Sequence, residues 1–284
     1  MNTPSISTSP PVVSVLMAAY NAERTLRSAV LSVFRQTFRD WELVVLDDAS
    51  TDKTPEILVE LAATEPRMRV VRNDHNLRFS GTRNRLLELA DKRTEFLAVL
   101  DSDDIAYPAR LEKQVAFLRE HPELVAAGCC LRILDAEGAE VGSRSYPLEA
   151  KDVRNRALCS NPVAHSSLMM RKKVAETIGN YDATLSCCED YDYILRLLDC
   201  GEVANLPEEL VGYRVSDGQH TARHVKQMLS CTLAVQRRYL FRKKHFRLTP
   251  ILGFLGKHLL FLLPSGMILR LFRRMTVIRK EAKS

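Results

Sequence analysis

Short apolar runs and segments with helical periodicity alternate over the first hundred residues of this 284-residue chain. The apolar runs are typical of buried strands, and in the segments between them apolar residues recur every three or four positions. Runs and helical segments lie in turn at 12–19, 26–34, 42–46, 54–61, 68–71, 81–90 and 96–100. Strands that alternate with helices form right-handed crossovers, which make the strands parallel and cover both faces of the sheet. The sequence therefore predicts an α/β fold, a three-layer sandwich around a mostly parallel central sheet.

Elements of both kinds continue in the second half of the chain. We expect a helix at 108–120, a strand at 125–134, a hairpin turn at 135–138, a helix at 149–158, a buried strand at 163–170, a helix from Glu189, strands at 203–206 and 210–215, and a helix at 220–244 that leads the chain out of the core. Near the start, Asn21 is a candidate helix N-cap. Residues 1–11 are polar, show no signal peptide and are expected to be a disordered lead-in.

Two acidic clusters directly follow predicted strands. Asp47 and Asp48 follow the second strand, and Asp101-Ser102-Asp103-Asp104 follows the fourth. The carboxyl ends of parallel strands meet at the edge of the sheet where α/β proteins bind their ligands. Carboxylates one residue apart can reach one divalent cation and its phosphate ligand, although a solvated acidic turn would look the same in isolation. Neither a GxGxxG nor a GxxxxGK[ST] motif is present, so neither a dinucleotide fold nor a P-loop is supported.

The net charge of +6 is unevenly distributed. Residues 237–284 hold 13 Lys or Arg and one acid, Glu281, so this tail carries +12 and the remainder carries −6. An acidic body with a basic tail argues against a general nucleic-acid-binding protein and for one local anionic partner. The apolar run at 250–264 is interrupted by Lys257 and His258 and is too short to span a bilayer, whereas 267–274 mixes Leu, Phe and Arg. Basic amphipathic helices of this kind lie in the headgroup region of anionic membranes; the alternative is a helical hairpin packed on the domain or on a second copy.

The seven cysteines form no CxxC pair and show no zinc spacing. An odd number without a framework fits a reducing cytosol, in which cysteines serve mostly as small core residues.

Several motifs of this chain strongly resemble those of the family 2 glycosyltransferases. They are VSVLMAAYN (13–21), SVFRQTF (32–38), LDDASTD (46–52), Asn76 with GTRN (81–84), LDSDD (100–104), HSSLM (165–169), IGNYD (178–182) and EDYD (189–192). The resemblance covers about 12–215. It implies a glycosyltransferase catalytic domain at 12–219, with a nucleotide-binding half at 12–107 and an acceptor half at 108–219, followed by a basic amphipathic helical tail at 220–284.

The resemblance also implies an activity: inverting transfer of a sugar from a nucleotide-sugar donor to an acceptor hydroxyl, with Mn²⁺ or Mg²⁺. The implied donor-binding residues are Ala18 and Tyr20 at the base, Asp48 on the uracil ring of a UDP-sugar, Arg83 near the phosphates, Asp101 on the ribose or the metal shell, and Ser102 beside it. Asp103 is the implied metal ligand, and His220 is a second candidate ligand. Asp190 corresponds to the catalytic base, with Glu189 as the alternative, because spacing cannot separate adjacent residues.

Each of these residue types suits the chemistry. A metal that bridges both phosphates meets the charge on the leaving nucleoside diphosphate, and inversion needs one carboxylate to take the proton of the acceptor hydroxyl. Carboxylates in a first helical turn are also favoured by the helix dipole, so stability alone could explain Glu189 and Asp190. We expect Asp47 to brace its loop, Asp104 to be an N-terminal helix charge, and His165 to be a core histidine, with an acceptor-site role as its alternative.

Together these observations predict a cytosolic enzyme that adds one sugar per encounter and is held on the inner face of the membrane. The QxxRW motif of processive relatives is absent, and Trp41 is the only tryptophan. The expected acceptor is a lipid-linked saccharide used for surface polysaccharide. One rival is a nucleotidyltransferase, which would bring a glycine-rich loop where 18–22 has no glycine. The other is a non-catalytic sugar-nucleotide sensor, which would not need a base.

Overall fold

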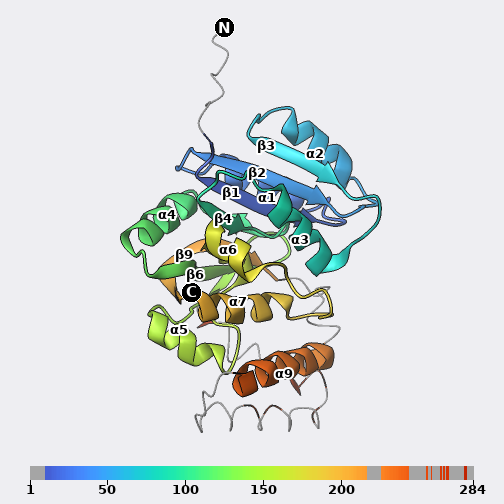
Figure 1. Ribbon diagram of the computed structural model, residues 1–284. Coiled ribbons are helices and arrows are strands. Elements are labelled where there is room, and N and C mark those ends of the chain that lie inside the picture. The colour runs from blue at the N-terminus through green and yellow to red at the C-terminus, as the bar shows by residue number, and fades with distance from the viewer. Residues whose placement is uncertain are drawn as a thin grey trace, which may run out of the picture.

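The computed structural model describes residues 10–215 and 225–242, with single positions between 254 and 279. Within them one sheet has the strand order β10-β7-β6-β8-β4-β1-β2-β3, with β9 beside β6 and β5 beside β9. Figure 1 shows β3, β2, β1 and β4 side by side in the upper part of the domain, with β6 and β9 below them. The strands are β1 (Val13–Ala19), β2 (Trp41–Asp47), β3 (Met68–Arg72), β4 (Phe96–Val99), β5 (Ile105–Ala106), β6 (Leu124–Leu134), β7 (Glu140–Arg144), β8 (Met169–Arg171), β9 (Glu202–Arg214) and β10 (Ile278–Arg279). The helices are α1 (Leu26–Phe34), α2 (Thr54–Ala62), α3 (Arg78–Leu89), α4 (Arg110–Glu120), α5 (Ala150–Ala157), α6 (Lys172–Ile178), α7 (Glu189–Cys200) and α9 (Val225–Arg242), with a 3₁₀ turn η1 (His165–Ser167).

The first half is the predicted parallel sheet. β1 pairs in parallel with β2 and β4, and β2 pairs in parallel with β3. Each of these strands is connected to the next in sequence by a helix, as the alternation of apolar runs and helical segments predicted. The parallel α/β architecture is therefore confirmed.

Helices cover both faces of this sheet. Along β1, successive side chains point to opposite faces. Val13, Val15 and Met17 pack in one cluster with apolar residues of α1, α2 and α4. Leu16 packs in a second cluster, which contains residues of α3, α6 and α7. The strands are buried on both faces, which explains why they read as continuous apolar runs and confirms the three-layer sandwich.

The predicted strand at 163–170 is wrong over most of its length. Only Met169–Arg171 forms a strand, β8, which lies antiparallel between β4 and β6 and joins the two halves of the sheet. His165–Ser167 forms a 3₁₀ turn whose side chains are all buried. Each serine side chain there has a contact of its own: Ser166 Oγ accepts from the Asp101 N–H at 3.0 Å, and Ser167 Oγ accepts from the Cys129 N–H at 3.3 Å. A regular strand could not make these contacts.

Two other expectations for the second half need correction. The two strands expected at 203–206 and 210–215 form one long strand, β9, which pairs in parallel with β6 through irregular register at Cys129–Leu131. The helix expected to leave the core, α9, packs on α7 instead, and its Leu233, Val235 and Tyr239 are buried. Its apolar residues therefore extend the core on the α7 side of the sheet.

Some tail residues also contact the domain. The Lys257 ammonium donates to the Cys159 carbonyl and, at 3.1 Å, to Gln236 Oε1 of α9. Ile268 is fully buried. Within the described part of the chain, no helix has the length and hydropathy needed to cross a membrane.

Candidate active site

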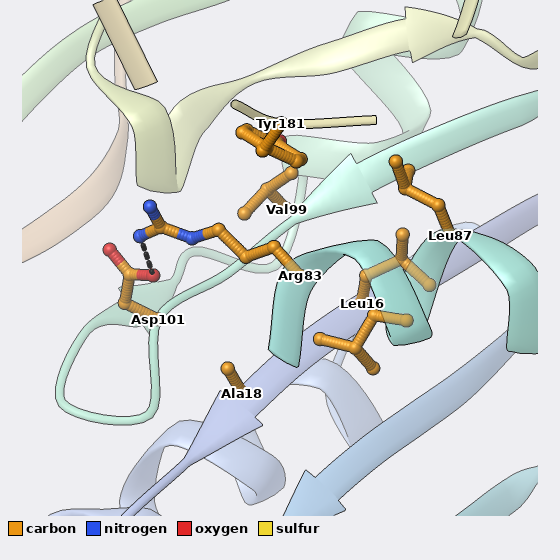
Figure 2. Close-up of a pocket in the computed structure, with 8 residues that line it drawn as sticks. Leu16, Ala18, Arg83, Leu87, Val99, Asp101 and Tyr181 are labelled. Carbon is orange, nitrogen blue, oxygen red and sulfur yellow. Dashed lines mark ion pairs between the residues drawn. The ribbon is translucent and has the colours of Figure 1, made fainter. Parts of the chain in front are cut away.

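The candidate site lies where β1, β2 and β4 end, beside the first turns of α3 and α7. A shallow hollow opens there, as Figure 2 shows. Its lining is apolar except at one end and consists of Leu16, Ala18, Arg83, Leu86, Leu87, Val99, Asp101 and Tyr181. Arg83 and Asp101 form the polar end, and Ala18 lies at the end of β1. The predicted ligand edge of the sheet and this hollow therefore coincide.

Most carboxylate oxygens of the acidic cluster after β2 accept hydrogen bonds from the protein itself. The buried Asp47 carboxylate accepts from the Ser50 N–H through Oδ1 at 3.0 Å. Its Oδ2 has no hydrogen-bond partner but lies 3.4 Å from Arg72 Nε. The buried Asp48 carboxylate accepts three hydrogen bonds, from Asn73 Nδ2 at 2.7 Å and from the N–H groups of Leu77 at 2.8 Å and Arg78 at 3.1 Å. The bracing role predicted for Asp47 is confirmed, and Asp48 ties β2 to the start of α3.

Asn21 does not cap a helix, because α1 begins only at Leu26. It adopts a positive φ of 49° and bridges to the loop after β2. Its N–H donates to Ser50 Oγ at 2.9 Å, and its Oδ1 accepts from the Thr51 N–H at 2.8 Å. These two hydrogen bonds join the ends of β1 and β2. Tyr20, which follows β1 directly, is half-exposed at 51%.

The acidic cluster after β4 is crowded. Burial raises the pKa of the Asp101 carboxyl, but His165 and Arg83 outweigh burial and bring the pKa down to about 2. Burial and the charge of Asp101 raise the pKa of Asp103 to about 6. Burial and the charges of Asp103 and Asp101 raise the pKa of Asp104 well above its usual range. Nearby positive groups thus stabilise the ionised form of Asp101, whereas the ionised forms of Asp103 and Asp104 are disfavoured.

Asp104 is not an N-terminal helix charge. Only 1% of it is exposed, it precedes β5, and α4 begins six residues later at Arg110. Its Oδ1 accepts from the Arg214 N–H of β9 at 2.9 Å, while its Oδ2 has no hydrogen-bond partner. The pairing of β5 with β9 buries this carboxyl, which therefore holds the loop after β4 against the second half of the domain.

Arg83 connects the two halves of the site. Its guanidinium pairs with the Glu189 carboxylate of α7 and lies 3.6 Å from Asp101 Oδ1. Burial lowers the pKa of Arg83, but Asp101 and Glu189 outweigh burial and raise the pKa above its usual value. One cation from the first half thus holds a carboxylate from each side of the site.

The two candidate bases differ in their surroundings. Glu189 is 6% exposed and paired with Arg83. Asp190 is partly exposed, and its Oδ2 accepts a hydrogen bond of 3.0 Å from Asn161 Nδ2. Nothing in the sequence pointed to Asn161, which lies 29 residues before its partner.

His165 lies against the site. It is buried, its Nε2 is 3.1 Å from the Tyr181 hydroxyl, and its Nδ1 is 3.9 Å from Asp101 Oδ1. Nδ1 has no hydrogen-bond partner, because 3.9 Å is too long for one. His165 is therefore a core histidine, as expected, that also faces a site carboxylate.

The structure brings most of the predicted residues to one edge of the sheet: Ala18, Tyr20, Asp48, Arg83, Asp101, Ser102, Asp103, Glu189 and Asp190. His220 lies outside the described residues. Asn84 and Tyr181 each fall inside a motif of the chain but had no role assigned, and the structure places their segments in contact.

The residues present suit a hard divalent cation. Asp101 and Asp103 offer carboxylate oxygens, which Mn²⁺ and Mg²⁺ prefer. Burial and the charge of Asp101 raise the pKa of Asp103, so a bound cation would favour its ionised form. Among the described residues, no group of three or more His, Cys, Asp or Glu side chains could hold a metal. A cation here would therefore draw part of its coordination from a ligand such as a diphosphate.

Comparison with known sequences identifies the family. Residues 14–179 match the model described as Glycosyl transferase family 2. An uncharacterized glycosyltransferase of Haemophilus influenzae is 32% identical over 220 residues, 74% of this chain and 67% of that protein. The amylovoran biosynthesis glycosyltransferase AmsE of Erwinia amylovora is 31% identical over 204 residues, which are 71% of this chain and 75% of that protein. The UDP-Glc:alpha-D-GlcNAc-diphosphoundecaprenol beta-1,3-glucosyltransferase WfgD of Escherichia coli is 38% identical over 107 residues, which are 38% of this chain and 41% of that protein.

Solved structures share the fold. S. aureus TarS 1–349 in complex with UDP-GlcNAc superposes with a TM-score of 0.66 at 20% identity, over 87% of this chain and 72% of that one. The mannosyltransferase PcManGT from Pyrobaculum calidifontis, in complex with GDP-Man and Mn²⁺, superposes with a TM-score of 0.59 at 17% identity. The superposition covers 94% of this chain and 81% of that one. At these identities the likeness concerns the architecture alone.

Proposed function

Because the chain belongs to glycosyl transferase family 2, we propose that it transfers a sugar from a UDP-sugar to an acceptor hydroxyl with inversion. One observation carries the proposal: Arg83 holds Asp101, beside Asp103, on one side and the first turn of α7, with Asp190, on the other. Charge stabilisation at the leaving group and a base for the acceptor are the two functions that such a reaction requires.

The donor binds at the ends of β1, β2 and β4 in this proposal. Ala18 and Tyr20 face the base, and Ser102 lies beside the ribose. Asp48 keeps one free lone pair on Oδ2 after its three hydrogen bonds, and this lone pair accepts from the uracil N–H. Arg83, held between Asp101 and Glu189, offers its remaining N–H groups to the diphosphate.

Asp103, with Asp101, would hold Mn²⁺ or Mg²⁺, which when bound offsets the negative charge of the leaving UDP. His220 remains a further candidate ligand. The Mn²⁺ in the PcManGT complex supports a divalent cation in this fold.

Asp190 is the proposed base. Glu189 is buried and its carboxylate is occupied by Arg83, which makes it a poor proton acceptor. Asp190 is partly exposed and is oriented by Asn161. It takes the proton of the acceptor hydroxyl as that oxygen attacks the anomeric carbon, and the bond between the sugar and UDP breaks on the opposite face.

The first experiment is a thermal-shift screen of UDP-sugars with and without Mn²⁺, followed by turnover of the sugar that stabilises most. We expect one UDP-sugar to stabilise the protein strongly only with Mn²⁺. Asp190→Asn should then keep UDP binding and lose turnover. If no nucleotide sugar stabilises the wild type, the proposed donor class is wrong; if Asp190→Asn also loses UDP binding, the proposed role of Asp190 is wrong.

The acceptor is proposed to be a lipid-linked saccharide for surface polysaccharide, reached from the cytoplasmic face of the membrane. The names of WfgD and AmsE support this acceptor class. The +12 tail at 237–284 supports an anionic surface as its partner. The absence of QxxRW supports the addition of one sugar per encounter.

Membrane association can be tested by charge reversal without shortening the chain. Changing Arg270, Arg273 and Arg274 to Glu should abolish sedimentation with phosphatidylcholine vesicles that contain phosphatidylglycerol. The matched control reverses Lys53, Lys92 and Lys151, which lie on the body of the protein, and should still sediment. Equal sedimentation of both variants and the wild type would contradict a role for the tail.

A further inference from the structure

Helix α3 reaches across the site with two adjacent side chains. Arg83 pairs with Glu189, as described above. The side-chain amide of Asn84 makes two hydrogen bonds to the backbone of one residue: Nδ2 donates to the Tyr181 carbonyl at 3.0 Å, and Oδ1 accepts from the Tyr181 N–H at 2.7 Å. Donor and acceptor lie 97 positions apart in the chain.

Tyr181 needs such a partner. It lies between the end of α6 and the start of α7, outside any helix or strand, and is only 3% exposed. A buried backbone N–H and C=O without a ladder must be satisfied by a side chain or by water. An amide such as that of Asn carries both a donor and an acceptor, so one side chain satisfies both groups.

Tyr181 in turn contacts the helix that carries the proposed base. Its ring stacks on Tyr193 of α7, with centroids 4.0 Å apart and an angle of 15° between the planes. Tyr193 is fully buried and lies one turn after Glu189, on the same side of α7. The Tyr181 segment, which Asn84 holds, therefore packs on α7 one turn after Glu189.

We infer that Asn84 is a positioning residue, which sets the distance between Asp190 and the donor by fixing Tyr181 against α7. The inference rests on the proposed function. The donor elements, at the ends of β1, β2 and β4, belong to the same half as Asn84 and are held by hydrogen bonds within that half, whereas Tyr181 contributes its ring to the lining of the hollow. Loss of the contact should therefore misplace the base while the donor site stays intact, and small misplacements of a reacting group reduce rates strongly.

The experiment compares Asn84→Asp with the wild type. The aspartate keeps the acceptor for the Tyr181 N–H but turns a carboxylate oxygen toward the Tyr181 carbonyl. We expect kcat for UDP release from the UDP-sugar found in the screen to fall at least about tenfold. The Kd for UDP with Mn²⁺ should stay within about twofold, and the number of UDP sites per protein gives the folded fraction to which kcat is normalised.

Two further variants complete the test. Asn84→Ala removes both hydrogen bonds and should lower kcat at least as much, with UDP affinity again unchanged. Ser80→Ala is the matched control, because Ser80 Oγ donates to the adjacent Asp182 carbonyl by a single bond of 3.3 Å on the same helix; its kcat should stay within about twofold of wild type.

A kcat that stays at the wild-type value in both Asn84 variants would overturn the inference. So would a loss of UDP affinity in parallel with kcat, since that would place the effect in the donor site. A wild type that binds no UDP with Mn²⁺ would instead refute the proposed function, and the inference with it.

Discussion

The clusters after β2 and β4 look alike in sequence but differ in how their carboxylates are satisfied. Asp48 accepts three hydrogen bonds from neighbouring protein groups, and Asp47 accepts from the Ser50 N–H. One buried carboxylate oxygen in each cluster has no hydrogen bond, but Asp47 Oδ2 lies 3.4 Å from Arg72 Nε. The second cluster has the unpartnered Asp104 Oδ2 and an Asp103 whose pKa is raised to about 6. The first cluster stabilises a loop, whereas the second maintains uncompensated charge.

This difference distinguishes carboxylates whose charge the protein already compensates from carboxylates that could offer charge to a cation. Native proteins pair almost all of their buried polar groups, and the exceptions concentrate at functional sites. Proximity to a strand end put both clusters on the ligand edge of the sheet. Only the second has charge that a cation would stabilise.

Removing charge from the second cluster should have the largest effect, on activity. We expect Asp103→Asn to lower the rate of UDP release from the donor sugar by about 10³-fold, because stabilisation of the leaving group is lost. The wild type and the variant are compared at saturating Mn²⁺ and UDP-sugar. A variant that keeps more than a tenth of the wild-type rate would remove Asp103 from the reaction.

Removing a carboxylate from the first cluster should cost stability. Asp48→Ala leaves two backbone N–H groups and the Asn73 amide without their acceptor, at about 2–3 kcal/mol of unfolding free energy. Urea denaturation measures this loss, and Asp48→Asn, which keeps one acceptor oxygen, should lose less. If Asp48→Ala unfolds at the wild-type urea concentration, the two clusters do not differ as described.

The smallest effect should be a gain in stability. The folded protein raises the pKa of Asp103 from 3.8 to about 6, so its ionisation opposes folding as the pH rises through this range. Without metal, Asp103→Asn should therefore be more stable than the wild type above pH 6, on the order of 1 kcal/mol, and equally stable below about pH 4. Urea denaturation in EDTA at low and neutral pH tests this, and a variant less stable at neutral pH would contradict it.

Sequence periodicity determined the first half of the fold. Continuous apolar runs and helical spacing are local signals, and each of the four strands in 12–100 is where they predicted. Because parallel strands end at one edge, the positions of Asp48 and Asp101 followed from the same pattern. The assignment of Glu189 and Asp190 to the site came instead from the resemblance of the EDYD motif to the glycosyltransferase family.

Tertiary structure alone decided what each polar group contacts. The contacts of Arg83 with Glu189, of Asn84 with Tyr181 and of Asp104 with Arg214 each span about a hundred residues, and local periodicity carries no information at that separation. Residues 163–170 were predicted as a strand for the same reason. The N–H groups that bind the buried serines of this segment belong to Asp101 and Cys129, which are far away in the sequence. The sequence thus determined which residues reach the site, and only long-range packing decided which carboxylates there are compensated by the protein and which are not.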